Sequence, residues 1–230
     1  MRLALLALAA PVLLSGSLAA TAGPGVPRVV EVPSRPAFVQ LPRRSEIVAQ
    51  PGLRLATDAT LRTQKPGRLQ VQLANGRSFR LGGDAVLRLG ANGVDLVKGQ
   101  IIAWVNPGQK GGSPLTVKTR VATASIVGTT VFIEATPDGV QFFSWEGQVR
   151  VTTPSGQRFD LSSGQQLAFE KGAWVPPRRL TPGEAASRRQ KSILLNGFAA
   201  PMETMPVIER ELGLKAVPLR SAAPAPEPAR

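Results

Sequence analysis

Apolar and polar residues alternate along most of the chain between residues 50 and 171, and glycines separate the short alternating runs. The pattern is clearest in residues 114–151, PLTVKTRVATASIVGTTVFIEATPDGVQFFSWEGQVRV. The Gly128-Thr129 step interrupts this stretch, and Asp138-Gly139 and Gly147 mark its turns. Period-two alternation broken by glycine turns is typical of short, half-buried β-strands. The pattern therefore predicts that this region is built from strands.

Turn signals recur roughly every 8 to 17 residues, which favours an all-β sandwich, barrel or solenoid-like fold over βαβ units. Asn75-Gly76 and Asn92-Gly93 are hairpin signals, and Gly99 is expected to separate two further strands. We predict an all-β domain of many short antiparallel strands. Its inward side chains are expected to include Leu69, Val71, Phe79, Leu81, Leu87, Val94, Leu96, Leu115, Val117, Ile126, Val131, Ile133, Val140, Phe142, Val149 and Val151.

The segments that flank this domain differ from it in composition. Residues 23–49 hold five prolines and are expected to form an extended lead-in without a helix. After the domain, Pro176-Pro177-Arg178-Arg179 is expected to form a stiff hinge. Residues 220–230 alternate between proline and alanine and are expected to be a disordered tail.

Two short helices are predicted between the hinge and the tail. Thr181-Pro182-Gly183-Glu184 is a capping box with proline at the first helical position, and its helix is expected to run to about Asn196. A second helix is expected over Met205–Leu212. We expect both helices to fold back and cover an edge or a face of the β domain. The alternative is that they dock onto a partner protein.

The N-terminus has the features of a secretory signal peptide. Met1-Arg2 precedes the apolar stretch Leu3–Leu14, and Ala20-Thr21-Ala22 is a small-residue cleavage site. The apolar stretch is shorter than the about 20 residues that cross a bilayer. We therefore expect cleavage after Ala22 and a periplasmic or secreted protein without a transmembrane segment; an uncleaved anchor is the alternative. The expected organisation is signal peptide 1–22, lead-in 23–49, β domain 50–172, helical extension 173–219 and tail 220–230.

The chain lacks histidine, cysteine and tyrosine. Their absence removes the commonest general base, the soft metal ligands and any Ser-His-Asp or Cys-His arrangement, and it also excludes a lipoprotein anchor. Gly108–Gly112 is rich in glycine but lacks the spacing of a phosphate-binding loop, and we expect a hairpin loop there. Carboxylates are scattered singly, mostly at turns. We expect no enzyme activity, no cofactor and no metal site; a carboxylate pair in a cleft is the remaining route to catalysis.

Four ordered segments carry a further pattern of turn glycines and inward strand residues. They are LANGRSFRL at Leu73–Leu81, VDLVKGQIIAWV at Val94–Val105, the V-x-T and G-T steps within Leu115–Ile133, and WEGQVRV at Trp145–Val151 with LSSGQQ at Leu161–Gln166. Over about residues 52–170 this pattern resembles the FecR domain, a periplasmic sensor domain of iron-uptake signalling. Val131 stands where that family usually has phenylalanine, and Phe132 follows one place later. The resemblance implies a fold rather than a site.

The resemblance also implies a class of function. In iron-uptake regulators the FecR domain lies in the periplasm, behind a membrane helix and a cytoplasmic segment that controls a sigma factor. A cleavable signal is expected here in place of both parts, so the resemblance implies a stand-alone exported form without sigma-regulating activity. It points to a non-catalytic envelope protein that acts as a protein-interaction or sensor module, with an envelope protein as its partner.

The net charge of +13, or +12 without the one arginine of the signal peptide, favours anionic surfaces. The alternative function is therefore a basic binding module for an anionic cell-wall polymer or glycan, although solubility alone is a simpler explanation of the charge. Nucleic acid is disfavoured because aromatic residues for stacking are few. The basic strand residues that are expected to point outward form a candidate basic surface: Arg68, Arg80, Arg88, Lys118, Arg150 and Arg158.

Overall fold

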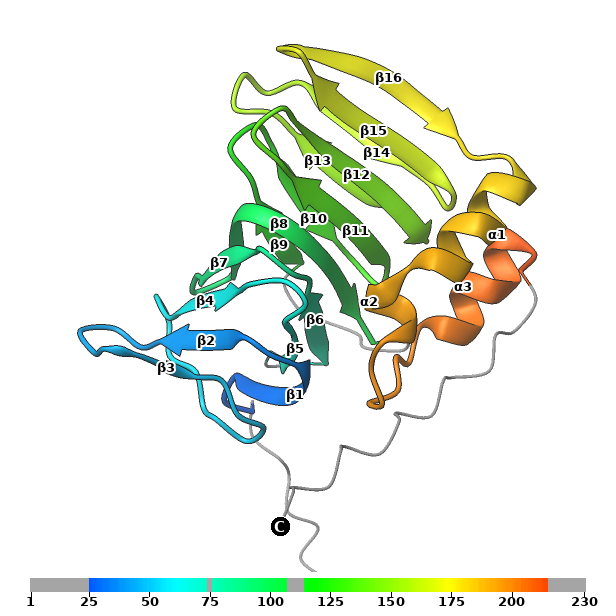
Figure 1. Ribbon diagram of the computed structural model, residues 1–230. Coiled ribbons are helices and arrows are strands. Elements are labelled where there is room, and N and C mark those ends of the chain that lie inside the picture. Colours follow the sequence, from blue (N-terminus) through cyan, green and yellow to red (C-terminus); the bar gives the residue numbers. More distant parts are fainter. Residues whose placement is uncertain (1–24, 74–75, 107–113, 215–230) are drawn as a thin grey trace, which may run out of the picture.

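The computed structural model describes residues 25–73, 76–106 and 114–214. The expectations for the signal peptide at 1–22, for Asn75, for the loop at Gly108–Gly112 and for the tail at 220–230 lie outside the described residues. The described part of the chain forms sixteen strands and three short helices (Figure 1). The prediction of an all-β domain with a C-terminal helical part is confirmed.

The strands form two layers that share one long strand. One layer, which we call the covered sheet, has the order β1 (Arg28–Ser34), β5 (Arg68–Gln72), β6 (Arg77–Leu81), second half of β8 (Gly93–Val105), β11 (Thr130–Ala135), β12 (Gly139–Glu146), β15 (Gln165–Glu170), β16 (Ala173–Arg179). The other layer, the open sheet, has the order β3 (Glu46–Val48), β2 (Ala37–Gln40), β4 (Thr60–Thr63), β7 (Val86–Leu89), first half of β8, β9 (Leu115–Lys118), β10 (Thr123–Ile126), β13 (Val149–Thr152), β14 (Arg158–Leu161).

The shared strand β8 continues through Gly99, where the sequence pattern predicts a break between two strands. Gly99 has a φ of +93°, and the strand pairs with β7 before it and with β6 and β11 after it. The first half of β8 stays in the open sheet. There its residues Gly93–Asp95 pair with β9, and this pair is parallel. All other pairs among the described strands are antiparallel, as predicted.

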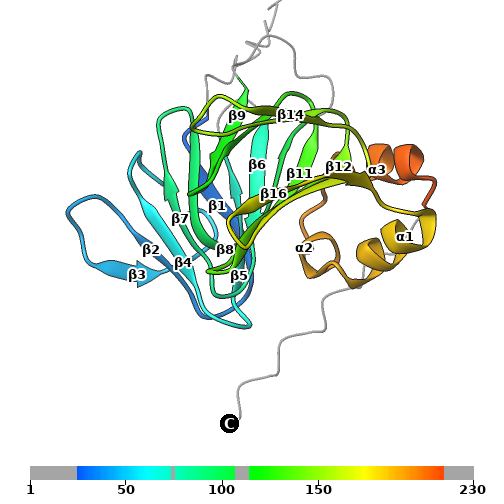
Figure 2. The same ribbon diagram turned by 90° about the horizontal axis from the view of Figure 1, so that it is seen from above.

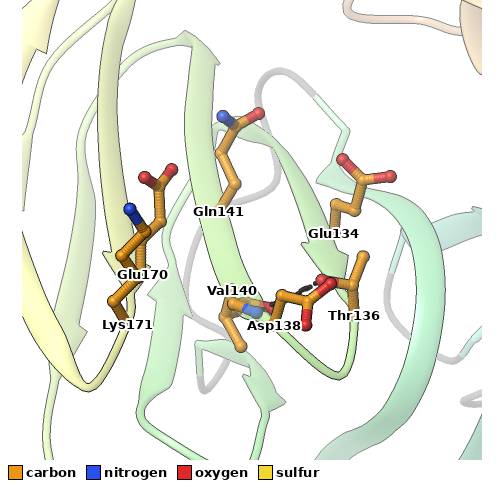
Figure 3. A pocket seen from close by; sticks show the side chains of 8 residues that line it. Glu134, Thr136, Asp138, Val140, Gln141, Glu170 and Lys171 are labelled. Atoms are coloured by element: carbon orange, nitrogen blue, oxygen red, sulfur yellow. Dashed lines mark hydrogen bonds between the residues drawn. The ribbon is translucent and has the colours of Figure 1, made fainter.

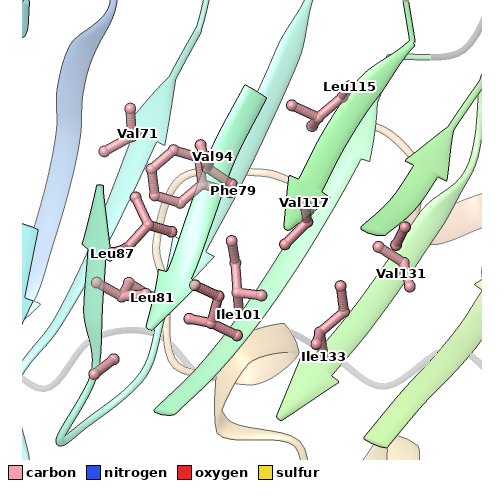
Figure 4. Packing of buried hydrophobic residues seen from close by; sticks show 14 of the residues in the cluster. Val71, Phe79, Leu81, Leu87, Val94, Ile101, Leu115, Val117, Val131 and Ile133 are labelled. Atoms are coloured by element: carbon pink, nitrogen blue, oxygen red, sulfur yellow. The ribbon is translucent and has the colours of Figure 1, made fainter. Parts of the chain in front are cut away.

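The main hydrophobic core lies between the two sheets. Alternate residues of most strands point into it, in agreement with the period-two pattern of the sequence. Val131 takes the inward place on β11, and Phe132 points to the opposite face of the covered sheet. The core side chains labelled in Figure 4 are Val71, Phe79, Leu81, Leu87, Val94, Ile101, Leu115, Val117, Val131 and Ile133.

The proline-rich lead-in is extended, and its three strands belong to the sheets. β1 pairs with β5 at one edge of the covered sheet, and β2 pairs with β4 in the open sheet. The strand-built part of the chain therefore begins at Arg28, earlier than the alternation of the sequence indicates. Pro33 is compatible with this arrangement because β1 is an edge strand, where a missing backbone N–H need not break a ladder.

The hinge predicted at Pro176-Pro177-Arg178-Arg179 is wrong, because these residues form the second half of β16. This strand is the other edge of the covered sheet. The register shifts between Gln166 and Ala168, opposite the two prolines. An edge position and an irregular register are the conditions under which a strand tolerates proline.

Three helices follow β16 and pack on the outer face of the covered sheet, and Figure 2 shows them gathered on one side of the strands. α1 (Pro182–Lys191) begins at the predicted capping box, and α2 (Ile193–Asn196) and α3 (Met205–Leu212) follow it. Within the described residues, no helix is both long and apolar enough to span a bilayer. The interface between helices and sheet is a second hydrophobic cluster of Ile102, Trp104, Phe132, Phe143, Trp145, Leu194, Leu195, Phe198, Met202 and Ile208.

Candidate functional site

The outer face of the open sheet holds four of the six residues of the candidate basic surface. Arg88, Lys118, Arg150 and Arg158 are all exposed there. Residues that pair directly across strands project from the same face of a sheet. The register therefore places in one line a set of side chains that we call the basic row: Arg88, Asp95, Lys118, Thr123, Thr152 and Arg158.

Acidic side chains balance only part of this charge. Asp95 lies between Arg88 and Lys118 in the register, and Arg150 Nε lies 2.7 Å from Asp160 Oδ1. Both side chains of the Arg150–Asp160 pair are more than half exposed, so the pair contributes little to stability. The face keeps an excess of positive charge, with threonine hydroxyls between the basic groups, which suits a polar partner with acidic groups.

Arg80 does not belong to a solvent-exposed basic surface, and that prediction is wrong. Its side chain is 1% exposed because α2 and the following loop cover the covered sheet at this point. Its Nη1 donates to the carbonyls of Leu194 and Leu195, and its Nη2 donates to the carbonyl of Ala200 over 2.6 Å. Arg80 therefore holds the helices onto the sheet.

Arg68 is half-buried and lines a groove on the covered sheet, on the opposite side of the molecule from the basic row. The groove lies beside the helical layer, and Ile193 of α2 forms part of its wall. Its larger part has a volume of about 480 Å³. A smaller part of about 290 Å³ adjoins it and shares Glu134 and Thr136 with it (Figure 3).

The carboxamide and carboxylate side chains of Gln100, Glu134 and Gln141 form the floor of this groove. Gln100 Nε2 donates to Glu134 Oε1 over 2.6 Å, and Arg188 Nη2 of α1 donates to Gln141 Oε1 over 3.0 Å. Figure 3 shows Glu134 and Gln141 standing on neighbouring strands. No sequence motif marks these residues, because outward polar residues of a strand look alike until the register aligns them.

Acidic residues line both parts of the groove. The described residues contain no group of three or more potential metal ligands. Glu134 and Glu170 both line the smaller part of the groove, but Figure 3 shows Gln141 between them. The groove offers hydrogen-bonding groups that could recognise a polar ligand.

A buried carboxylate, Glu146, lies under α3 at the end of β12. It is 3% exposed and accepts a hydrogen bond from Thr130 Oγ1 over 3.0 Å, and Thr130 also bonds Thr204. Glu211 and Arg210 of α3 are its charged neighbours. Burial raises the pKa of Glu146 to about 7, against the opposing effect of the Thr130 hydrogen bond and with a further contribution from Glu211.

We expect Glu146 to make the protein less stable as the pH rises. Between the usual pKa of 4.5 and the folded value of about 7, the unfolded chain releases a proton that the folded protein keeps. The contribution of Glu146 to stability is therefore complete below the lower value and is lost as the pH passes the higher one. The total change is about 3 kcal/mol.

Urea unfolding between about pH 5 and pH 8 measures this effect. Glu146→Gln imitates the protonated carboxyl and should flatten the dependence on pH. Glu170→Gln changes an exposed carboxylate and serves as the matched control. Parallel pH curves for Glu146→Gln and the unmodified protein would contradict the assignment.

Comparison with known proteins gives a family match and likenesses to solved structures. Residues 59–150 match the family model of the FecR protein. Two crystal structures of a candidate anti-sigma factor from Parabacteroides distasonis ATCC 8503, at 1.65 Å and 2.50 Å resolution, are each 18% identical to this chain. Their TM-scores are 0.47 and 0.49; the matches cover 52% and 57% of this chain and 59% and 64% of those chains. A search of the curated proteins finds no match.

Proposed function

This chain carries a FecR domain at residues 59–150, and from that premise we propose that it is an exported, non-catalytic envelope protein that acts as a protein-interaction or sensor module. FecR proteins are regulatory rather than enzymatic, and their domains act through protein partners. An interaction module of this kind needs a surface to which another protein can bind. The outer face of the open sheet is the surface that we assign to this role.

The observation that carries this proposal is the FecR domain together with the uncovered face of the open sheet. Helices pack on the outer face of one sheet, whereas Arg88, Lys118 and Arg158 of the basic row are exposed on the other. An exposed sheet face with aligned charges and hydroxyls offers both electrostatic steering and hydrogen bonds to a partner. The charged side chains of this face would influence the rate and the specificity of association with the partner protein.

A cross-linked pull-down from envelope extracts tests the proposal. The mature full-length chain should recover one dominant protein, and the double variant Lys118→Glu/Arg158→Glu should reduce that recovery about tenfold or more, because like charges would then face each other. Arg54→Glu reverses an exposed charge away from the basic row and is the control. Recovery of no protein above background would overturn the function, and equal recovery with the double variant would overturn the surface.

Export is tested by the N-terminus of the mature protein. If the leader is removed after Ala22, mass spectrometry of the periplasmic or secreted fraction should find a chain that begins at Gly23. Detection of the intact leader on membrane-bound protein would contradict cleavage, and recovery of the chain only from the cytoplasm would contradict export.

A second candidate function is a binding module for an anionic cell-wall polymer or glycan. The observation that favours it is the alignment of Arg88, Lys118 and Arg158 in the basic row. The protein should then sediment with purified wall polymer at low salt and detach as the ionic strength rises, because exposed charges are screened over about 8 Å at physiological salt. Salt-independent sedimentation, or none, would contradict this function.

A further inference from the structure

We propose that the groove on the covered sheet binds a carboxylated sugar, with Arg68 as the partner of the carboxylate and with Gln100, Glu134 and Gln141 as partners of the hydroxyls. This site goes beyond the proposed function, because it lies on the other sheet from the basic row. It would give a sensor module a small-molecule ligand. The argument rests on the shape, the floor, the wall and the charges of the groove.

The shape of the groove suits a short saccharide. The two adjoining parts have volumes of about 480 and 290 Å³, which is within the size range of small-molecule sites. They share Glu134 and Thr136, so a ligand longer than one ring could extend from one part into the other. An elongated polar groove at a sheet face fits a chain of sugar units better than a compact ligand.

The floor offers donors and acceptors at regular intervals. The register aligns Gln100, Glu134 and Gln141 on three neighbouring strands, which lie about 4.8 Å apart. This separation is comparable to that of alternate hydroxyls around a sugar ring. Among the described residues, the second carboxylate oxygen of Glu134 and the amide nitrogen of Gln141 have no hydrogen-bond partner, so each can bind a hydroxyl.

The wall offers apolar surface to the carbon–hydrogen face of a ring. Ile193 is 47% exposed on α2, and Pro66 and Pro137 come from turns on the other sides. The residues that line the two parts include no aromatic side chain. The groove therefore lacks the stacking surface that a nucleobase or another aromatic ligand would use.

The charges of the groove favour a single carboxylate. The Nε atom of Arg68 is buried and has no hydrogen-bond partner within the described residues, and burial lowers the pKa of this residue. Its guanidinium can form the paired hydrogen bonds that a carboxylate accepts. Lys98 adds positive charge, whereas Glu134 and Asp84 would repel a doubly charged phosphate.

Calorimetric titration of the mature full-length chain with cellobiuronic acid, a disaccharide with one carboxylate, tests this proposal. We expect measurable binding with a dissociation constant of about 1 mM or below, and about tenfold weaker binding of the neutral disaccharide cellobiose. Inorganic phosphate should bind more weakly than the sugar acid. No binding of the sugar acid, or equal binding of the acid and the neutral sugar, or tighter binding of phosphate would overturn the proposal.

Two variants locate the site. Arg68→Gln should weaken binding of the sugar acid about tenfold, and Lys98→Gln should weaken it about threefold through an exposed side chain that the fold does not need. Arg54→Gln, which changes an exposed arginine that lines neither part of the groove, should leave sugar binding unchanged. If Arg68→Gln and Lys98→Gln bind as the unmodified protein does, the site is wrong. Partner capture through the basic row is measured separately, so its failure would not be confused with failure of sugar binding.

Discussion

Replacement of Arg80 with methionine should lower the free energy of unfolding by about 3 to 5 kcal/mol, because it leaves buried polar groups without a partner. The Arg80 guanidinium donates to the carbonyls of Leu194, Leu195 and Ala200, and its Nε donates to Gln70 Oε1 over 2.8 Å. Methionine fills a similar volume but donates no hydrogen bond. The loss should be largest where the helices meet the sheet.

Two aromatic rings and two carboxylates around Arg80 favour the charged form of its guanidinium. Its guanidinium carbon lies 4.4 Å from the ring centroid of Phe198 and 5.5 Å from that of Trp104. Burial lowers the pKa of Arg80 to about 10, and Glu31 and Glu203 act in the opposite direction, so the group stays charged at neutral pH. Removing it would also take away the favourable electrostatic interaction of Arg80 with these two carboxylates.

Urea unfolding followed by circular dichroism and tryptophan fluorescence measures the effect of Arg80→Met. The fluorescence should also shift to longer wavelength before global unfolding, because Trp104 lies beneath the helices that Arg80 holds. Arg88→Met removes an exposed arginine from the open sheet and should change stability by only about 0.5 kcal/mol. A loss for Arg80→Met no larger than that of the control would show that the buried contacts do not hold the helical layer.

Substitution of Gly99 with alanine should cost about 2 to 5 kcal/mol, since it combines backbone strain with a collision. The φ of +93° is unfavourable for any residue with a Cβ atom. A Cβ at this position would also lie 2.4 Å from Ala85 Cβ and 2.5 Å from Ala85 Cα. Position 99 of β8 therefore lies so close to Ala85, the residue just before β7, that only glycine fits.

Gly156 provides a matched control for this substitution. Its φ is +86°, close to that of Gly99, but an added Cβ would meet no atom within 4 Å. Gly156→Ala should therefore show the backbone cost alone, about 1 to 2 kcal/mol. The difference between the two variants in thermal or urea unfolding measures the steric contribution. Equal losses would mean that β8 can shift away from Ala85 without cost.

The pattern of apolar residues predicted which side chains fill the space between the sheets. Val71, Phe79, Val131 and Val149 all lie in the core as expected, since a strand buries every second residue and the alternation indicates which one. The capping box at Thr181–Glu184 marked the start of α1 equally well, because both of its hydrogen bonds are local. Local signals of this kind need no knowledge of distant residues.

Where the prediction failed, a distant part of the chain decided the outcome. Arg80 occupies an outward strand position, as predicted, but α2 and its loop, more than 110 residues later in the chain, cover it. Pro176-Pro177 was predicted to be a hinge because prolines normally interrupt a strand. The edge position of β16, which allows prolines in a strand, depends on the packing of the whole sheet. The groove was not predicted, because its floor depends on the register of β8, β11 and β12.

The sequence by itself determined the class of fold, the inward residues of the strands and the capping of the helices, because periodicity and caps act over a few residues. It also placed the basic residues on strands. Only the tertiary structure decided which of them share an exposed face, which one is buried under the helices and which one lines a groove. The reason is that the alternation along a strand sets the face on which each side chain lies. What covers that face depends on packing between elements that are far apart in the chain.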